Sequence, residues 1–229
     1  MRIGLLPSAG TATRMNGIPK FLLPVSGEVQ CLLDYHVQLM KPFVDRIIIP
    51  TRSEWVSLLQ SFDFGDGVEI VQLNTDTMSE TLRKALAGVA YQTCVLGMPD
   101  TYFVDENPYR ELRNFPGHDL TLRLYPTRAE QIGKVGSVRL GTGNTVVDHA
   151  DKQPEVDYGW HWGVMEFAKH VEEFLDPTSP HSGYLVSECL MRGLDIVGVP
   201  SSNTYFDCGT FQEYRQCLIH LQETEPDST

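Results

Sequence analysis

Residues Met1–Gly27 read MRIGLLPSAGTATRMNGIPKFLLPVSG, and they are the most informative part of the chain. An apolar run, Ile3–Pro7, leads into a loop of small residues, Ser8–Thr13, and then into Arg14. The stretch includes Lys20 but no acidic residue, although the whole chain has a formal net charge of -12. Small side chains let backbone N–H groups approach phosphate oxygens, and cationic side chains add to such a site. We therefore expect a strand followed by a loop that binds a highly charged anion.

The composition narrows the class of protein. A chain of 229 residues buries one sizeable core and is most simply a single domain. No apolar run approaches the ~20 residues of a membrane span, and we expect no signal peptide. The five cysteines form no CxxC pair, which indicates reduced thiols rather than disulfides or a zinc site. The acidic balance argues against binding to nucleic acid or to anionic membranes, and we expect a cytoplasmic protein.

Strand-like and helix-like patterns alternate after the first loop. Short runs rich in Val, Ile and Leu have the character of buried parallel strands: Arg46–Pro50, Val68–Leu73 and Cys94–Met98. Between them, apolar residues recur at helical spacing, and Thr77 with Glu80 forms a capping-box pattern that would begin the second helix. This strand–helix–strand order predicts a parallel sheet with helices on both faces.

The second half of the chain has a different pattern. Short strand-like segments separated by glycine turns predict an antiparallel excursion over about 119–150, within one domain that spans 1–222. A helix is predicted over Tyr184–Met191 and a strand over Asp195–Pro200. A last helix would begin at Thr210, with an apolar face formed by Phe211, Tyr214, Leu218 and Leu221. The polar tail, 223–229, is predicted to be disordered.

Several charged residues have positions that suit phosphate chemistry. Arg14 and Lys20 follow the small-residue loop, where two cations would stabilise a polyphosphate leaving group, although for the loop taken alone a tight turn is the favoured interpretation. Asp100 and Asp207 each follow an apolar stretch, and one or two carboxylates plus substrate phosphates are typical Mg²⁺ ligands. Their alternatives are a turn residue for Asp100 and a helix-entry aspartate for Asp207. Lys152 beside a proline suits a phosphate contact, or is a solvated surface lysine.

Taken together in order and spacing, these motifs resemble those of the sugar-1-phosphate nucleotidylyltransferases, including glucose-1-phosphate thymidylyltransferase-like proteins. The family's GxGTRM/L and PKxLLPV elements resemble Gly10–Met15 and Pro19–Val25. Its GDxxF, EKP, DxGT and base-reading QxxxDG elements resemble Pro99–Phe103, Asp151–Pro154, Asp207–Thr210 and Gln72–Thr77, in that order. The resemblance runs from residue 1 to about 221.

The resemblance implies a Rossmann-like, three-layer α/β/α nucleotidyltransferase fold of the GT-A-like type, with a mixed, mostly parallel sheet. It implies that the phosphate of a sugar-1-phosphate attacks the α-phosphorus of an NTP and that pyrophosphate leaves, with Mg²⁺ as cofactor. Arg14 would hold the pyrophosphate portion, and Lys20 would neutralise charge at the α-phosphate. Asp100 and Asp207 would bind Mg²⁺, and Lys152 would position the sugar phosphate.

The same resemblance assigns the remaining site residues. It places a nucleotide-binding role on Ala9, Gly10, Thr11, Gln72 and Thr77, and a sugar-side role on Gly136 and Asp151. The Gln72 amide can donate to and accept from a pyrimidine edge, which favours a pyrimidine NTP, although a polar strand end explains it equally. Gly136 would let a sugar approach closely, or is a bulge glycine.

The chain also departs from the family pattern. Ala12, Thr77 and Pro99 stand where the family has glycine, and Gln153 is an extra residue before a proline. Two alternatives to an active sugar enzyme therefore stay open. One is a cytidylyltransferase for a non-sugar phosphate such as a polyol or choline phosphate. The other is a binding or regulatory module that has lost turnover. The sequence leaves the sugar, the nucleotide and the presence of a homo-oligomer undecided.

Overall fold

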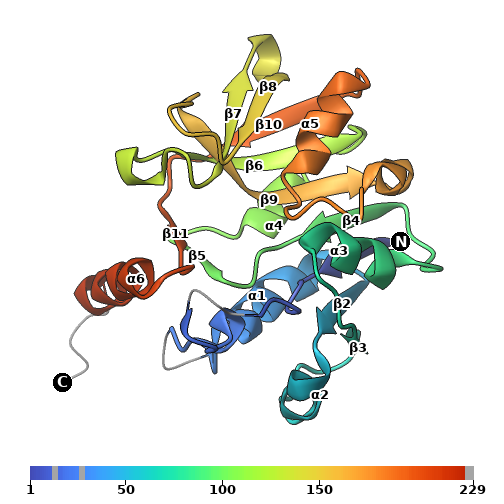
Figure 1. The fold of residues 1–229 in the computed structure, drawn as a ribbon, viewed down its shortest axis with the longest axis vertical. Helices are drawn as coiled ribbons and strands as arrows, with labels where there is room; N and C mark the ends of the chain where they lie inside the picture. The colour runs from blue at the N-terminus through green and yellow to red at the C-terminus, as the bar shows by residue number, and fades with distance from the viewer. Residues whose placement is uncertain (12–14, 26–28, 225–229) are drawn as a thin grey trace.

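The computed structural model describes residues 1–11, 15–25 and 29–224. Its main sheet is built from nine of the described strands, in the spatial order β10-β6-β9-β4-β1-β2-β3, with the hairpin β7–β8 attached to β9 (Figure 1). These strands are β1 (Arg2–Leu5), β2 (Arg46–Thr51), β3 (Val68–Gln72), β4 (Thr93–Leu96), β6 (Leu120–Pro126), β7 (Gly136–Leu140), β8 (Val146–Asp151), β9 (Trp160–Ala168) and β10 (Ile196–Pro200).

The sheet is mixed and mostly parallel, as predicted. Strands β4, β1, β2 and β3 pair in parallel, and β10 pairs in parallel with β6. Between these two groups lies β9, which is antiparallel to both β4 and β6. A second, two-stranded antiparallel sheet joins β5 (Thr101–Phe103) to β11 (Tyr205–Asp207), so that chain segments about a hundred residues apart lie side by side.

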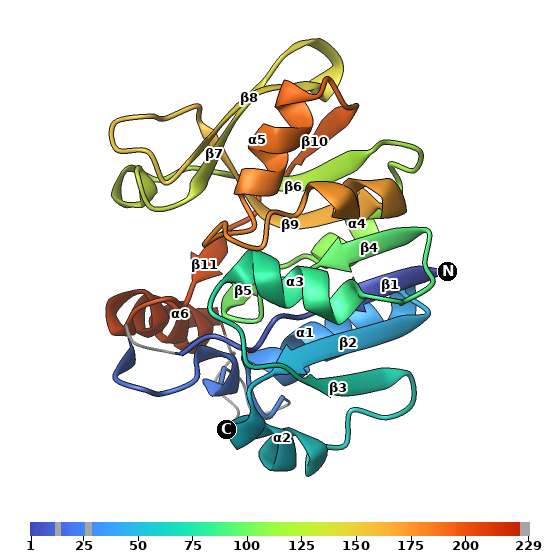
Figure 2. The ribbon, with the colours of Figure 1, turned by 45° about the vertical axis from the view of Figure 1, so that its right-hand side comes forward.

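Helices cover both faces of the sheet and give it three layers (Figure 2). On one face lie α3 (Met78–Leu86), η6 (Lys169–Phe174) and α5 (Tyr184–Met191), and on the other lie α1 (Leu32–Met40) and α4 (Pro108–Leu112). The other helices are α2 (Ser53–Gln60), α6 (Phe211–Thr224) and the short η2 (Lys20–Leu22), η3 (Lys41–Phe43), η4 (Ala129–Gln131) and η5 (Thr142–Asn144). In the part of the chain that the structure describes, none of the helices combines the length and apolarity needed to cross a bilayer.

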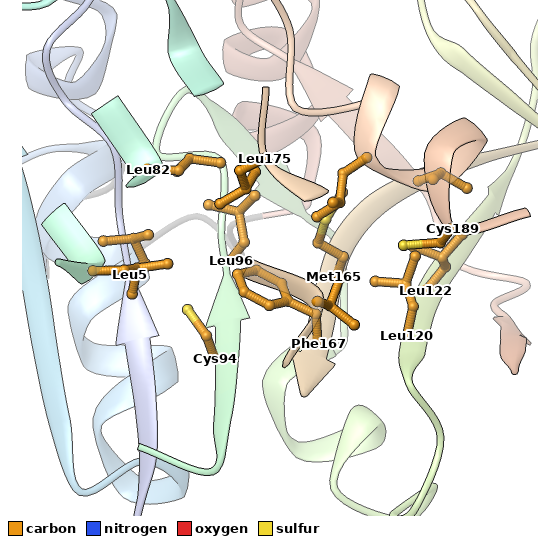
Figure 3. Close-up of a cluster of buried hydrophobic side chains, with 14 of the residues drawn as sticks. Leu5, Leu82, Cys94, Leu96, Leu120, Leu122, Met165, Phe167, Leu175 and Cys189 are labelled. Atoms are coloured by element: carbon orange, nitrogen blue, oxygen red, sulfur yellow. The ribbon is translucent and has the colours of Figure 1, made fainter. Parts of the chain in front are cut away.

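The two faces of the sheet carry separate apolar clusters, which explains why the parallel strands are apolar along their whole length. One cluster packs Leu5, Leu96 and Phe167 of the sheet against helices α3 and α5, as Figure 3 shows for its central side chains. The other packs Ile47 and Ile49 of β2 against α1 and α4. Burial on both faces holds the strands in register.

Three segments differ from the sequence prediction. Within the segment expected to be antiparallel, β6 belongs to the main sheet and runs parallel to β10, while β7 and β8 form a hairpin that extends to Asp151. In α6, Phe211 is 49% exposed and the fully buried residue is Cys217, because the buried face follows Tyr214, Cys217, Leu218 and Leu221. Residues 223 and 224, predicted to belong to a disordered tail, are helical, and 225–229 lie outside the described residues.

Candidate active site

A cavity of about 340 Å³ lies at the carboxyl ends of the parallel strands. The segments that follow β1 and β4 form one side of it, and the β7–β8 hairpin and the residues before α5 form the other. Ligands of open α/β sheets bind at this edge, because the strand ends and the loops that follow them converge there. The cavity brings together most of the predicted site residues, namely Gly10, Thr11, Lys20, Asp100, Gly136, Asp151, Lys152 and Asp207.

The small two-stranded sheet places the two predicted metal ligands side by side. Asp207, at the end of β11, is the register partner of Thr101, which begins β5 directly after Asp100. The Cys208 N–H donates to the carbonyl of Asp100 at 2.8 Å, which ties the two segments at this point. The two aspartates are 107 positions apart in the chain, and a single strand pairing brings their segments together.

Lys20 completes this charged group. Its Nζ lies 3.1 Å from Asp100 Oδ2, and the two side chains are only 13% and 22% exposed. Lys20 begins the short helix η2, which is anchored by the buried Phe21. One cation and two carboxylates thus line the same cavity.

A buried histidine holds β5 in place behind Asp100. Burial lowers the pKa of His36 to about 4, so its ring is neutral at pH 7. Its Nε2 lies 2.8 Å from the Thr101 carbonyl, and its Nδ1 contacts the Tyr109 hydroxyl. The arrangement requires that Nε2–H donates to the carbonyl and that Nδ1 accepts from the tyrosine. This contact fixes the backbone directly next to Asp100.

The far end of the cavity is formed by the β7–β8 hairpin. Gly136 and Asp151 are register partners there, and Lys152 follows with its Nζ 3.0 Å from His181 Nδ1. Burial raises the pKa of Asp151, although nearby Lys152 and His181 act in the opposite direction. A Cβ at Gly183 would lie 2.3 Å from Asp151 Oδ1, so a glycine is needed for this carboxylate to keep its place.

Among the residues that line the cavity, two have a buried polar atom without a hydrogen-bond partner in the described part of the chain. The atoms are Asp151 Oδ2 and Trp162 Nε1. A Cβ at Gly136 would lie 2.3 Å from Trp162 Nε1, so the glycine leaves room beside the indole. A buried polar group without a partner costs free energy, and such groups in a cavity indicate where a ligand would supply the missing bonds.

His161, on β9, is 1% exposed and does not line the cavity. Burial lowers its pKa to about 4. The neighbouring β8 contributes His149, whose pKa burial likewise lowers to about 4 and whose Nδ1 lies 2.8 Å from Ser187 Oγ.

A second cavity of about 210 Å³ adjoins the first and shares Pro7, Gly10, Thr11 and Met78 with it. Ala9 and Thr77, predicted to bind the nucleotide, line this cavity. Gln72 is exposed at the end of the edge strand β3 and lines neither cavity. Arg14 and Ala12 lie outside the described residues, so the role assigned to Arg14 stays a sequence prediction.

The structure adds residues that the sequence analysis did not assign. Arg52 and Thr75 line the second cavity, and Trp162, His181, Ser182 and Gly183 line the first. A usable signal existed for Arg52, because a cation two residues after the apolar run 46–50 lies near the carboxyl end of a predicted strand. The segment 181–183 carries no motif, and only its position before α5 brings it to the site.

The donor set fits a magnesium ion. Asp207 on β11 and Asp100 directly before β5 would supply oxygen ligands, and Mg²⁺ commonly takes one or two carboxylates and completes its shell with phosphates and water. Within the described residues, no cluster of three or more His, Cys, Asp or Glu side chains offers an all-protein metal site. The pair therefore suits a metal that arrives with a phosphate ligand.

No protein-family model and no curated protein sequence matches the chain. Solved structures do match over almost their whole length. A UDP-glucose pyrophosphorylase in complex with UDP-glucose is 14% identical, with a TM-score of 0.82 over 98% of this chain and 100% of its own. A candidate glucose-1-phosphate thymidylyltransferase from Bacillus anthracis, bound to sucrose, is 19% identical, with a TM-score of 0.80 over 100% and 98%. The inositol-1-phosphate CTP transferase from T. maritima is 15% identical, with a TM-score of 0.75 over 99% and 98%. At these identities the similarity establishes a shared nucleotidyltransferase fold, which confirms the predicted fold class.

Proposed function

We propose that this protein is a nucleotidylyltransferase that joins an NTP to a sugar-1-phosphate and releases pyrophosphate. The observation that carries the proposal is that Lys20, Asp100 and Asp207 line the same cavity, within which two further groups of residues lie. On one side lies the small-residue loop, and on the other lie Asp151 and Lys152. A reaction that joins two phosphate-bearing substrates needs such a charged centre with a subsite on either side.

The reaction is an in-line displacement at phosphorus. A phosphate oxygen of the acceptor forms a bond to the α-phosphorus of the NTP, and the bond from that phosphorus to the bridging α–β oxygen breaks. Pyrophosphate carries away the electron pair. A phosphate monoester is already anionic at pH 7, so no general base is required, and positioning with electrostatic stabilisation supplies most of the catalysis.

The residues of the site divide these tasks. Backbone N–H groups of the loop at Gly10 and Thr11 would face the phosphates, and a Cβ at Gly10 would meet no atom of the described residues within 4 Å, which leaves space for them. Lys20 would leave Asp100 for the α-phosphate and balance the charge that develops there. Asp100 and Asp207 would hold Mg²⁺, which when bound neutralises phosphate charge. Lys152 would fix the attacking phosphate.

The acceptor end suits a molecule with hydroxyl groups. A hydroxyl both donates and accepts, so it can donate to the Asp151 carboxylate and accept from the Trp162 indole N–H, each of which has a buried atom without a partner among the described residues. This favours a sugar phosphate or a polyol phosphate over choline phosphate, whose ammonium group offers no acceptor to an indole N–H. The similarity in fold to an inositol-1-phosphate CTP transferase supports testing polyol phosphates as well as sugars.

Pyrophosphate release tests the proposal. The purified protein is incubated with Mg²⁺ and each of CTP, GTP, UTP, dTTP and ATP against a panel of sugar-1-phosphates and polyol phosphates, and pyrophosphate is assayed. We expect release with at least one pair, dependent on both substrates and lost in Asp100→Asn. If no pair releases pyrophosphate while calorimetry detects NTP binding, the protein is a binding module and the proposed reaction is wrong.

A further inference from the structure

The polar side chains of the second cavity are mostly engaged with one another. Thr75 and Thr81 share a hydrogen bond between their hydroxyls, and the Thr81 hydroxyl also donates to the Thr77 carbonyl at 2.9 Å. The Thr77 hydroxyl accepts from the Glu80 N–H at 3.0 Å and donates to the Pro177 carbonyl at 2.6 Å. These three threonines form the wall of the cavity, and their hydroxyls are already used.

Arg52 is a cationic side chain of the same cavity and, unlike the threonines, keeps hydrogen-bond donors that the described residues leave unused. Its Nε donates to the Ala9 carbonyl and its Nη2 to the Thr75 carbonyl, both at 2.9 Å, so the half-buried guanidinium is fixed between the first loop and the segment before α3. A guanidinium has five N–H donors. Among the residues that the structure describes, the other three N–H groups have no acceptor, although the side chain lines the cavity.

Asp76 is an anionic side chain of this cavity and likewise keeps hydrogen-bond acceptors that no described residue uses. Its backbone N–H donates to Glu80 Oε2 at 2.9 Å, which holds the residue at the start of α3. Its side chain is exposed and lines the same cavity, and within the described ranges the carboxylate makes no hydrogen bond or ion pair. Thr11 also lines this cavity, but it belongs to the loop shared with the first cavity.

We propose that the second cavity holds the base of the nucleotide, that Arg52 and Asp76 select it, and that the base is cytosine or guanine. The inference rests on the proposed function, since it needs an NTP in the adjoining site. A fixed guanidinium offers parallel N–H donors and pairs best with two neighbouring acceptors. Cytosine offers O2 and N3, and guanine offers O6 and N7. Each base also carries N–H donors that the Asp76 carboxylate can accept, on N4 of cytosine or on N1 and N2 of guanine.

The other bases fit this pair of side chains less well. Uracil and thymine have an N–H between their two carbonyl oxygens, and adenine has its amino group beside N7. Each therefore sets a donor against the donors of Arg52, or leaves part of the guanidinium without an acceptor. Gln72, which could have read a uracil edge, lines neither cavity.

Direct binding tests this selection separately from turnover. Isothermal titration calorimetry of the full chain with Mg²⁺ and no acceptor would compare CTP, GTP, UTP, dTTP and ATP. We expect CTP or GTP to bind at least roughly ten-fold more tightly than the other three, since one bidentate base contact discriminates by about this factor or more. A preference for CTP would show that the cavity selects a pyrimidine, and a preference for GTP would show that it selects a purine. Tightest binding of UTP, dTTP or ATP overturns the proposal, and so does the absence of NTP binding.

Two variants test whether Arg52 and Asp76 select the base. Arg52→Gln keeps an amide donor for a carbonyl but removes the paired donors, and Asp76→Asn changes an exposed residue whose loss does not threaten folding. We expect either to reduce the preference for CTP or GTP to within about three-fold, and the surface variant Arg110→Gln to keep it. If both site variants weaken all five nucleotides equally, the two residues are only structural and the proposal is wrong.

These outcomes separate the inference from the proposed function. Selective NTP binding without pyrophosphate release would leave the base site standing and refute the reaction. Efficient release with UTP or dTTP would establish the reaction and refute the base assignment.

Discussion

Replacing Lys20 by methionine separates the catalytic contribution of this lysine from its structural one. The Nζ lies 3.1 Å from Asp100 Oδ2, and both side chains are largely buried, so the pair lies between a surface ion pair and a fully buried one. We expect a loss of about 1 to 2 kcal/mol in the free energy of unfolding. For a chain of this size that corresponds to a fall in Tm of roughly 2 to 8 °C.

The effect on catalysis should be larger, because the same cation balances charge that is greatest in the transition state. Loss of one such preorganised group lowers kcat by about 10² to 10³, equivalent to about 2.7–4 kcal/mol. The assay is steady-state pyrophosphate release at saturating NTP and acceptor, beside a thermal melt of the same preparation. Lys84→Met is the matched control, because Lys84 forms an ion pair of 2.7 Å with Glu80 on the more exposed surface of α3. The control should keep kcat. If Lys20→Met lowers Tm but keeps kcat within three-fold, the lysine is structural and the assigned role is refuted.

Three further predictions follow from the same geometry. Gly183→Ala places a Cβ against the Asp151 carboxylate and should raise KM for the acceptor roughly ten-fold while KM for the NTP is unchanged; equal changes in both would contradict an acceptor site there. The buried imidazoles of His36, His149 and His161 have pKa values lowered to about 4, so below pH 6.5 the unfolded chain binds protons that the folded chain does not. The contribution of these neutral imidazoles to the free energy of unfolding is then fully present above about pH 6.5 and falls as the pH drops towards 4, by roughly 2 kcal/mol for each imidazole at pH 5. Urea unfolding at pH 7 and pH 5 checks this, and equal midpoints would contradict it. Chelation of divalent ions should abolish pyrophosphate release but leave the Tm of the nucleotide-free protein unchanged, since the two aspartates alone do not complete a magnesium site; a fall in Tm on chelation would indicate a structural metal instead.

The parallel part of the fold could be predicted because its signals are local. The run Arg46–Pro50 became β2 and the run Cys94–Met98 became β4, since strands buried on both faces are apolar at every position. The capping residue Thr77 begins α3 as expected, although the Glu80 carboxylate accepts from the Asp76 N–H rather than from Thr77 itself.

Long-range placement could not be predicted in the same way. Nothing within Trp160–Ala168 shows that this strand lies antiparallel between β4 and β6, because its neighbours are decided by packing across the whole sheet. In α6, Phe211 fits the helical period as well as Cys217 does. Only the position of the helix over Phe206 and Cys208 decides which of the two is buried.

Residues of the candidate site could be predicted where a sequence motif lies at the end of a strand. Asp100 and Asp207 lie side by side because β5 and β11 pair. The two motifs predicted a shared metal site, but neither motif shows which strands pair. Gln72 and Arg52 show the opposite case, since both are polar residues near the end of an apolar run. The edge position of β3 leaves the glutamine exposed, while two backbone carbonyls fix the arginine over the second cavity.

The fate of the α-phosphorus tests the central claim most directly. The protein is incubated with Mg²⁺, an acceptor phosphate and an NTP labelled with ³²P at either the α- or the γ-position, and the products are separated. We predict that the α-label enters a conjugate with the acceptor and that the γ-label leaves as pyrophosphate, with both products lost in Asp100→Asn. Release of the α-label as a free nucleoside monophosphate, or of the γ-label as inorganic phosphate, would show hydrolysis and contradict the account.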